Sequence, residues 1–166
     1  MVLPLLPSAY NLARWLTRNE HDADDVVQEA FLRAFRFFPS FRGGDPRAWL
    51  LAIVRNACWT WLRVNRSREV ATATALEDAD EPVDTAASAE EDLVRRADGA
   101  RLRRALEELP AEFREVTVLR ELEELSYKEI AEVAGIPIGT VMSRLARARR
   151  RLQAALARPA PEEVGT

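Results

Sequence analysis

The residue types that carry catalytic or metal chemistry are scarce in this sequence. Cys58 is the single cysteine and His21 the single histidine among 166 residues. One chain therefore cannot build a disulfide framework or a Cys/His metal cluster. There is also no glycine-rich phosphate loop and no pairing of a nucleophile with a base. We expect no enzyme, no cofactor and no metal, with Cys58 filling space in a core and His21 in a loop beside a helix start.

Positive charge is concentrated in one stretch. "PIGTVMSRLARARRR", residues 137–151, holds five arginines and no acid, although the chain has a net charge of -3. On a helical wheel one side is apolar and can pack: Val141, Leu145, Ala148 and Leu152. The other side is polar and basic: Thr140, Ser143, Arg144, Arg147, Arg150 and Arg151, with Met142 and Ala146 among them. Such a run can be a solvated helix face, but this pattern favours contact with a duplex major groove.

The residues just before this stretch predict a helix-turn-helix. Ser126-Tyr127-Lys128-Glu129 has the capping-box form that begins a helix. Gly135 can take the left-handed conformation that ends it, and Pro137 favours a new start. Ala131, Gly135 and Val141 have the spacing of a crossing residue, a turn residue and an anchor.

Apolar residues recur at three and four positions throughout, and no segment alternates like a strand. Residues 69–92 carry nine acids and no Lys or Arg, a composition that cannot bury a core. We therefore predict an all-α protein with two small helical domains, 7–66 and 93–157. A flexible acidic linker, 67–92, joins them, and a disordered tail, 158–166, follows. No segment is long and apolar enough to span a bilayer.

In the second unit, "LRRALEELPAEFREVTVLRELEELS" supplies two further amphipathic helices that are divided at Pro110. Their apolar residues are available for a core: Leu102, Leu106, Leu109, Phe113, Val116, Leu119 and Leu122.

In the first unit, "HDADDVVQEAFLRAFRFF" predicts a helix that starts at Asp22. Its expected buried stripe is Val26, Val27, Ala30, Phe31, Ala34 and Phe38. The opposite face holds Asp24, Asp25, Gln28, Glu29, Arg33 and Arg36, with Leu32 in their midst. An exposed leucine ringed by charges can be a docking spot, although single exposed apolar residues are common.

A second helix of this unit follows the loop "SFRGGDP". Asp45 caps it, Pro46 opens it, and it spans about 47–64. Its apolar side is Trp49, Leu50, Ile53, Val54, Ala57, Cys58 and Trp61; its other side is Arg55, Asn56, Trp59, Thr60 and Arg63. An aromatic residue flanked by arginines can stack on unpaired bases. Packing of Trp59 against a neighbouring helix is the alternative.

Taken together, these motifs resemble the extracytoplasmic-function sigma factors of bacterial RNA polymerase. "DADDVVQEAFLRAF", "SFRGGDPRAWLLAIVRNACWTWLR" and "LPAEFREVTVLRELEELSYKEIAEVAGIPIGTVMSRLARAR" follow the order and spacing of that family around a variable linker. The resemblance covers nearly the whole chain outside the linker and the tail. It implies a dissociable initiation factor that lends promoter specificity and strand opening to core polymerase.

The resemblance also implies roles for three groups of residues. Docking on the clamp helices of the largest polymerase subunit is expected of Asp24, Asp25, Gln28, Glu29, Leu32 and Arg33. Capture of a flipped base and melting of the minus-ten element are expected of Ser40, Phe41, Arg42, Gly43, Gly44, Arg55, Asn56, Trp59 and Arg63. Reading of the minus-35 element as duplex is expected of Thr140, Met142, Ser143, Arg144, Arg147 and Arg151.

Further expectations follow from the same resemblance. Partners would be core RNA polymerase, including its beta subunit, promoter DNA and an anti-sigma factor, in the cytoplasm. The acidic linker would thread toward the RNA exit path and keep the free protein off DNA. Met142 stands where many members have Lys or Arg, so its promoter contact would be apolar or absent. Members usually have more helix before "YNLARWL", so the first helix here would be short.

A different class of function remains open on the residues alone. A stand-alone helix-turn-helix regulator would bind duplex DNA without polymerase, as a dimer on paired half-sites. Its amino-terminal unit would bind a ligand or partner. No evident dimer stripe is present in the sequence.

Overall fold

The computed structural model describes residues 3–69 and 99–158, and within them every regular element is helical. This confirms the all-α prediction. Most of the expected acidic linker and nearly all of the expected tail lie outside the described residues.

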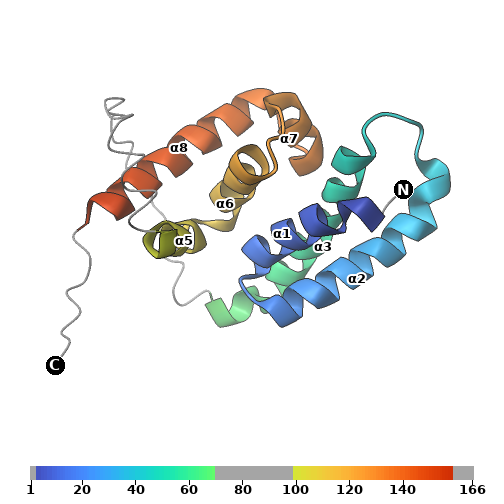
Figure 1. Cartoon of the computed structure of the whole chain (residues 1–166), viewed down its shortest axis with the longest axis horizontal. Coiled ribbons are helices and arrows are strands. Elements are labelled where there is room, and N and C mark those ends of the chain that lie inside the picture. The colour runs from blue at the N-terminus through green and yellow to red at the C-terminus, as the bar shows by residue number, and fades with distance from the viewer. Residues whose placement is uncertain (1–2, 70–98, 159–166) are drawn as a thin grey trace.

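The amino-terminal half is a bundle of α1 (Leu6–Thr17), α2 (Glu20–Phe37) and α3 (Pro46–Glu69), which pack against one another (Figure 1). A short 3-10 turn, η1 (Leu3–Leu5), precedes α1. α1 ends because Arg18 adopts a left-handed conformation, with φ of 59°. The side chain of Asn19 then accepts hydrogen bonds from the amides of His21 at 2.9 Å and Asp22 at 3.1 Å. α2 therefore begins at Glu20, two residues before the predicted start at Asp22, because Asn19 is its cap.

A loop of 3-10 helix and glycines joins α2 to α3. η2 (Phe38–Ser40) follows α2, and Gly43 and Gly44 have φ of 83° and 92°, which residues with a side chain rarely adopt. Asp45 accepts a hydrogen bond from the amide of Arg47 at 3.0 Å, so it caps α3 as predicted.

The carboxy-terminal half contains α5 (Gly99–Glu108), α6 (Ala111–Thr117), α7 (Tyr127–Ala134) and α8 (Ile138–Ala157). Pro110 separates α5 from α6, as predicted. One turn of π-helix, η3 (Val118–Leu122), extends α6. α8 packs along α5, α6 and α7, so it forms one side of the half (Figure 1).

The helix-turn-helix of α7 and α8 is built by the expected caps. Ser126 and Glu129 form the reciprocal capping box, with side chain to backbone distances of 3.1 Å and 3.0 Å. Gly135 ends α7 in the left-handed region with φ of 67°. Pro137 precedes α8, and its carbonyl accepts the amides of Thr140 and Val141.

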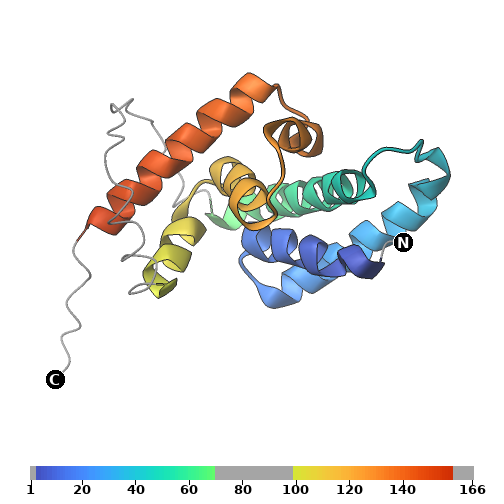
Figure 2. The same ribbon diagram turned by 45° about the horizontal axis from the view of Figure 1, so that its top comes forward.

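The two halves share a continuous apolar core, beside which Leu106, Leu109, Phe113 and Ala148 form a second cluster in the carboxy-terminal half. Fully buried Leu12, Leu16 and Val54 belong to the same cluster as Val116 and Ile130 of the carboxy-terminal half. α3 packs against α7, and α6 packs against both α1 and α8 (Figure 2). The two helical domains therefore pack against each other into one closed body.

Most of the expected core residues are buried, with two clear exceptions. Phe38 is 44% exposed because α2 has already given way to the 3-10 turn there. Leu122 is 48% exposed because the π turn shifts it off the helical stripe. Leu102, Phe31, Trp49 and Trp61 are partly buried against the core.

Candidate nucleic-acid interface

The predicted duplex-binding face begins at the amino terminus of α8. Val141, Leu145 and Ala148 are buried against the rest of the half, as the helical wheel requires. Met142 and Ser143 are exposed, and Met142 shows 52% of its surface. The first turn has no acidic residue and no side-chain cap, and Ile138 and Gly139 in it are exposed, so the positive end of the helix dipole is open to an anion.

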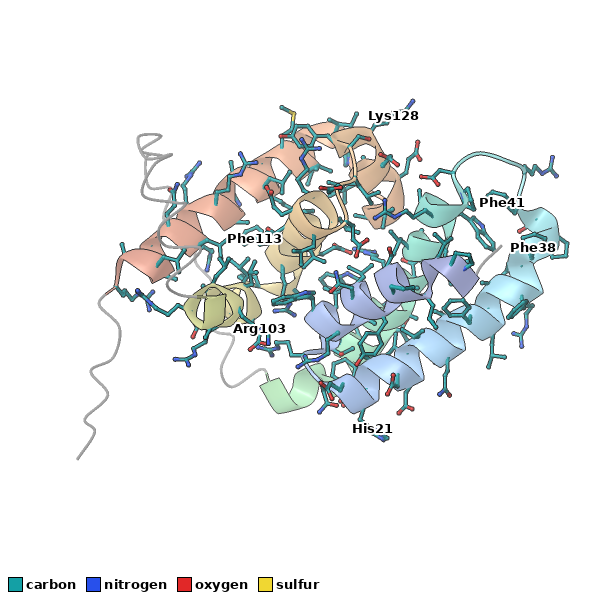
Figure 3. All side chains as sticks on the ribbon, in the orientation of Figure 1. His21, Phe38, Phe41, Arg103, Phe113 and Lys128 are labelled. Carbon is teal, nitrogen blue, oxygen red and sulfur yellow. The ribbon has the colours of Figure 1, made fainter. Side chains whose placement is uncertain are left out.

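The α8 arginines differ in their surroundings. Arg147 is exposed, whereas Arg144 lies 3.9 Å from Glu112 and keeps only 23% of its side chain exposed. Arg151 lies over the ring of Phe113, 5.3 Å from its centre, where Figure 3 labels that phenylalanine beside α8. Arg150 is half-buried. The exposed basic face of α8 is therefore narrower than the polar side that the helical wheel predicted. It is centred on Arg147 and begins at Thr140.

The residues predicted to capture a flipped base occupy the α2–α3 loop. Arg42, Gly43 and Gly44 are exposed, and the hydroxyl of Ser40 donates to the carbonyl of Phe37 at 2.6 Å. Phe41 lies against Trp49 with ring centres 5.2 Å apart. The ring centre of Phe38 lies 6.3 Å from that of Phe41 and 6.3 Å from that of Trp49, so the three rings contact one another (Figure 3). This aromatic cluster anchors the base of the loop and leaves Arg42 and the two glycines outside it.

Two of the α3 residues predicted to hold single-stranded DNA instead contact the carboxy-terminal half. The guanidinium of Arg55 pairs with the carboxylate of Glu115 on α6, and the indole N–H of Trp59 donates to the same carboxylate at 3.0 Å. Arg55 also lies over the ring of Trp59, 5.0 Å from its centre. Asn56 and Arg63 on the same helix remain exposed.

The Glu115 carboxylate is fully buried. Burial raises its pKa above the ordinary value for a glutamate, against the opposing effect of Arg55 and Trp59. The neighbouring Cys58 is also buried, and burial together with the negative charge of Glu115 raises the pKa of its thiol to about 12. This is the core role expected of Cys58; the expected loop position of His21 is wrong, because His21 lies in the first turn of α2.

A second carboxylate also joins the two halves. Glu123 accepts hydrogen bonds from Arg47 at 2.6 Å and from Asn11 at 2.9 Å, both in the amino-terminal half. Burial tends to raise its pKa, but the hydrogen bonds from Asn11, Arg47 and Ser8 outweigh it and hold the pKa low. Nearby, Arg114 donates to the carbonyl of Leu16 at 3.1 Å.

These contacts between halves were not found from the sequence. In the sequence, nothing distinguishes Glu115 from the other acidic residues of its amphipathic helix. Its partner Arg55 is 60 positions away. No local spacing pairs residues at such a separation. One sequence feature could have indicated an acidic partner: the polar face of α3 carries an arginine and an indole, and both are hydrogen-bond donors that require an acceptor when they are buried.

The predicted polymerase-docking face of α2 is free of the interface between halves. Asp24, Asp25, Gln28 and Glu29 are exposed, and Leu32 shows 67% of its surface. Arg33 pairs with Glu29 at 2.7 Å one turn away. This face of α2 therefore consists of the exposed Leu32, the acidic residues around it and the Arg33–Glu29 ion pair.

Within residues 3–69 and 99–158, no three side chains of the His, Cys, Asp and Glu types gather to hold a metal ion. In the same ranges, no helix combines the length and apolarity needed to cross a membrane.

Two family models match the chain. The model "Sigma-70 region 2" matches residues 1–68, and "Sigma-70, region 4" matches residues 99–152. Their boundaries coincide closely with the two helical halves. The order of the matches places the fold in the sigma-70 class.

Curated relatives narrow this class. ECF RNA polymerase sigma factor EcfG of Rhodopseudomonas palustris is 34% identical over 165 residues, which is 99% of this chain and 87% of that protein. RNA polymerase sigma-H factor of Pseudomonas aeruginosa is 34% identical over 93% of this chain and 84% of its own length. The chain belongs to the family of ECF sigma factors, which are transcription initiation factors. It spans 59% of the length of a further relative, SigE of Mycolicibacterium smegmatis, at 37% identity.

Solved structures agree with the fold over both halves. The sigma factor RpoE of Bartonella quintana, in complex with the anti-sigma factor NepR, matches with a TM-score of 0.70 and 31% identity over 93% of each chain. CnrH, in complex with the cytosolic domain of CnrY, matches with a TM-score of 0.65 and 28% identity over 93% of this chain and 84% of that one.

Proposed function

We propose that this protein is a dissociable promoter-specificity factor of RNA polymerase. It docks on the clamp helices of the polymerase through the α2 face around Asp25 and Leu32. It captures and melts the minus-ten element with the α2–α3 loop and the polar face of α3. It reads the minus-35 element as duplex with the amino-terminal half of α8. It has no chemistry of its own.

The observation that carries the proposal is the set of exposed surfaces on a fold of the sigma-70 class. α8 offers an uncapped amino terminus, and the exposed Arg147 lies on the same helix. Phosphates and guanine edges are natural ligands of such a helix end. On the opposite half, α2 offers Leu32 with 67% exposure among acids. An exposed apolar residue ringed by charge suits a protein partner better than DNA, because DNA repels acids.

An anti-sigma factor is part of the proposal. Of the two structural neighbours described above, one was solved with the anti-sigma factor NepR and the other with the cytosolic domain of CnrY. The compact body of this chain matches theirs over both halves, so we expect a protein of that kind to bind it and to keep it from polymerase.

The experiment is the association of this protein with purified core RNA polymerase, measured by co-migration in size-exclusion chromatography. We expect the unaltered chain to co-migrate and Asp25→Arg to lose association at least about tenfold, because a like charge then faces the basic part of a complementary interface. Asp25 is exposed, so the helical content should not change. Glu108→Arg makes the same charge change at an exposed position on α5 and serves as the control. If Asp25→Arg still associated fully with core polymerase, the docking face would have to lie elsewhere on the protein.

A further inference from the structure

We propose that the described conformation is a closed, self-inhibited form in which the Glu115 carboxylate occupies the groups on α3 that would otherwise hold single-stranded DNA. The inference rests on the proposed function, because it takes Arg55 and Trp59 as part of the strand-binding face. It adds to that function an intramolecular competitor for the same side chains.

The contacts of Glu115 are those that a nucleic-acid strand would make. Its carboxylate pairs with the guanidinium of Arg55, where a backbone phosphate would bind. It also accepts from the indole N–H of Trp59 at 3.0 Å. The guanidinium of Arg55 covers a face of the Trp59 ring at 5.0 Å, where a base would stack. Glu115 on α6 therefore engages the charge of Arg55 and the indole N–H of Trp59, while Arg55 covers the face of the ring.

The burial of these groups shows that the site is closed rather than merely contacted. The Glu115 side chain has no exposed surface and that of Arg55 keeps 19%. A strand of DNA cannot approach them while Glu115 of α6 contacts Arg55 and Trp59 of α3. Binding therefore requires the carboxy-terminal half to move away from the amino-terminal half.

The remaining contacts between halves are an apolar core, in which Leu12, Leu16 and Val54 cluster with Val116 and Ile130, and a set of polar pairs. Glu123 accepts from Arg47 and Asn11, Arg114 donates to the carbonyl of Leu16 at 3.1 Å, and Arg18 donates to the carbonyl of Glu107 at 3.3 Å. Opening therefore exposes apolar surface as well as polar groups. Loss of the Glu115 charge favours opening, because the closed form would then keep Arg55 largely buried without its charge partner. Glu115 differs from the others because it alone holds the strand-binding groups.

The test measures opening and strand binding on the full chain. Donor and acceptor dyes are attached at His21→Cys on α2 and Gln153→Cys on α8, both exposed positions, in a Cys58→Ala background. Energy transfer between them reports the separation of the halves. A labelled pool of random-sequence single-stranded DNA, followed by anisotropy, reports strand affinity. Circular dichroism checks that each variant keeps its helices.

Glu115→Gln keeps the size of the side chain and an acceptor for Trp59 but removes the charge opposite Arg55. We expect lower energy transfer and strand binding that is tighter by about tenfold or more, because the competent fraction of molecules rises. Glu121→Gln removes the same charge from an exposed ion pair with Arg149 inside one half. It should therefore change neither the energy transfer nor the affinity for single-stranded DNA. Adding Trp59→Ala to Glu115→Gln should abolish the gain in affinity and leave the halves open.

Three results would overturn the inference: unchanged energy transfer in a folded Glu115→Gln, opening without a gain in strand affinity, or a gain that survives Trp59→Ala. If Glu115→Gln does not fold, the unaltered dye-labelled chain is titrated with the same single-stranded pool; strand binding that leaves energy transfer unchanged would then contradict the proposal. Failure of the proposed function would appear separately, as a lack of association between the unaltered chain and core polymerase.

Discussion

Cys58 lies in the core beside the interface between the two halves and is fully buried. Burial raises the pKa of its thiol to about 12, so the neutral thiol persists across the physiological range. Compared with an ordinary value of 9.0, roughly a thousandth of the usual thiolate is present at mildly alkaline pH.

We therefore expect Cys58 to resist an aromatic disulfide reagent in the folded protein and to react fully in denaturant. The measurement is the release of the coloured thiolate over time at mildly alkaline pH. Stoichiometric reaction of the native protein within seconds would show that the side chain is neither buried nor neutral.

Arg147 is the α8 arginine best placed to contact a duplex, since it is exposed on the outward face. Arg147→Ala should weaken binding of duplex DNA and lower the slope of log affinity against log salt by about 1, as expected when one phosphate contact is lost. Arg103→Ala removes the same charge from the exposed side of α5 and should leave the slope unchanged. Equal effects of both variants would mean that α8 is not the duplex-binding helix.

At the scale of elements, α7 depends on its caps because it has only eight residues. An isolated helix of this length is unstable, so the Ser126–Glu129 box and the left-handed Gly135 fix where it begins and ends. Hydrogen bonds from the backbone and side chain of Ser126 lower the pKa of Glu129, so this part of the stability is lost as the pH falls through that pKa.

Ser126→Ala should lower the free energy of unfolding by about 1 kcal/mol, the usual cost of losing an amino-terminal cap. Denaturant unfolding followed by circular dichroism measures it. Lys128→Ala, at an exposed position in the first turn of the same helix, is the control and should change stability little. A Ser126→Ala variant as stable as the control would show that packing alone defines α7.

Local signals were sufficient for most elements. Capping residues, the glycine turn and helical periodicity predicted α7, α8, the start of α3 and the break at Pro110, because each depends on neighbours a few positions apart. Asn19 was missed as a cap because the acids after it offered a competing start. Leu122 and Phe38 were expected in the core because a wheel assumes a regular α-helix, whereas a π turn and a 3-10 turn occur there.

At the scale of the whole molecule, the arrangement of the two halves was not predictable from the sequence. The polar face of α3 was found, but the partner of Arg55 and Trp59 was not, because Glu115 comes from a distant segment. Packing of α3 against α7 and of α6 against α1 depends on long-range complementarity. The acidic linker was expected to keep the free protein off DNA, yet that linker lies almost wholly outside the described residues, and we propose Glu115 as an inhibitory residue inside the fold.

The docking face of α2 and the duplex face of α8 lie on different halves, and both stay exposed in the closed body. A partner can therefore engage either half before the body opens. We expect polymerase to bind α2 first, and promoter DNA then to complete the opening around Glu115.

The most direct test of the account is transcription by purified core RNA polymerase on sheared DNA of the source organism, with and without this protein, followed by mapping of the RNA 5′ ends. We predict reproducible new start sites that share two spaced upstream motifs and depend on the added protein. Absence of new starts with demonstrably active core polymerase would contradict a promoter-specificity role and favour a stand-alone regulator that binds duplex DNA through α8.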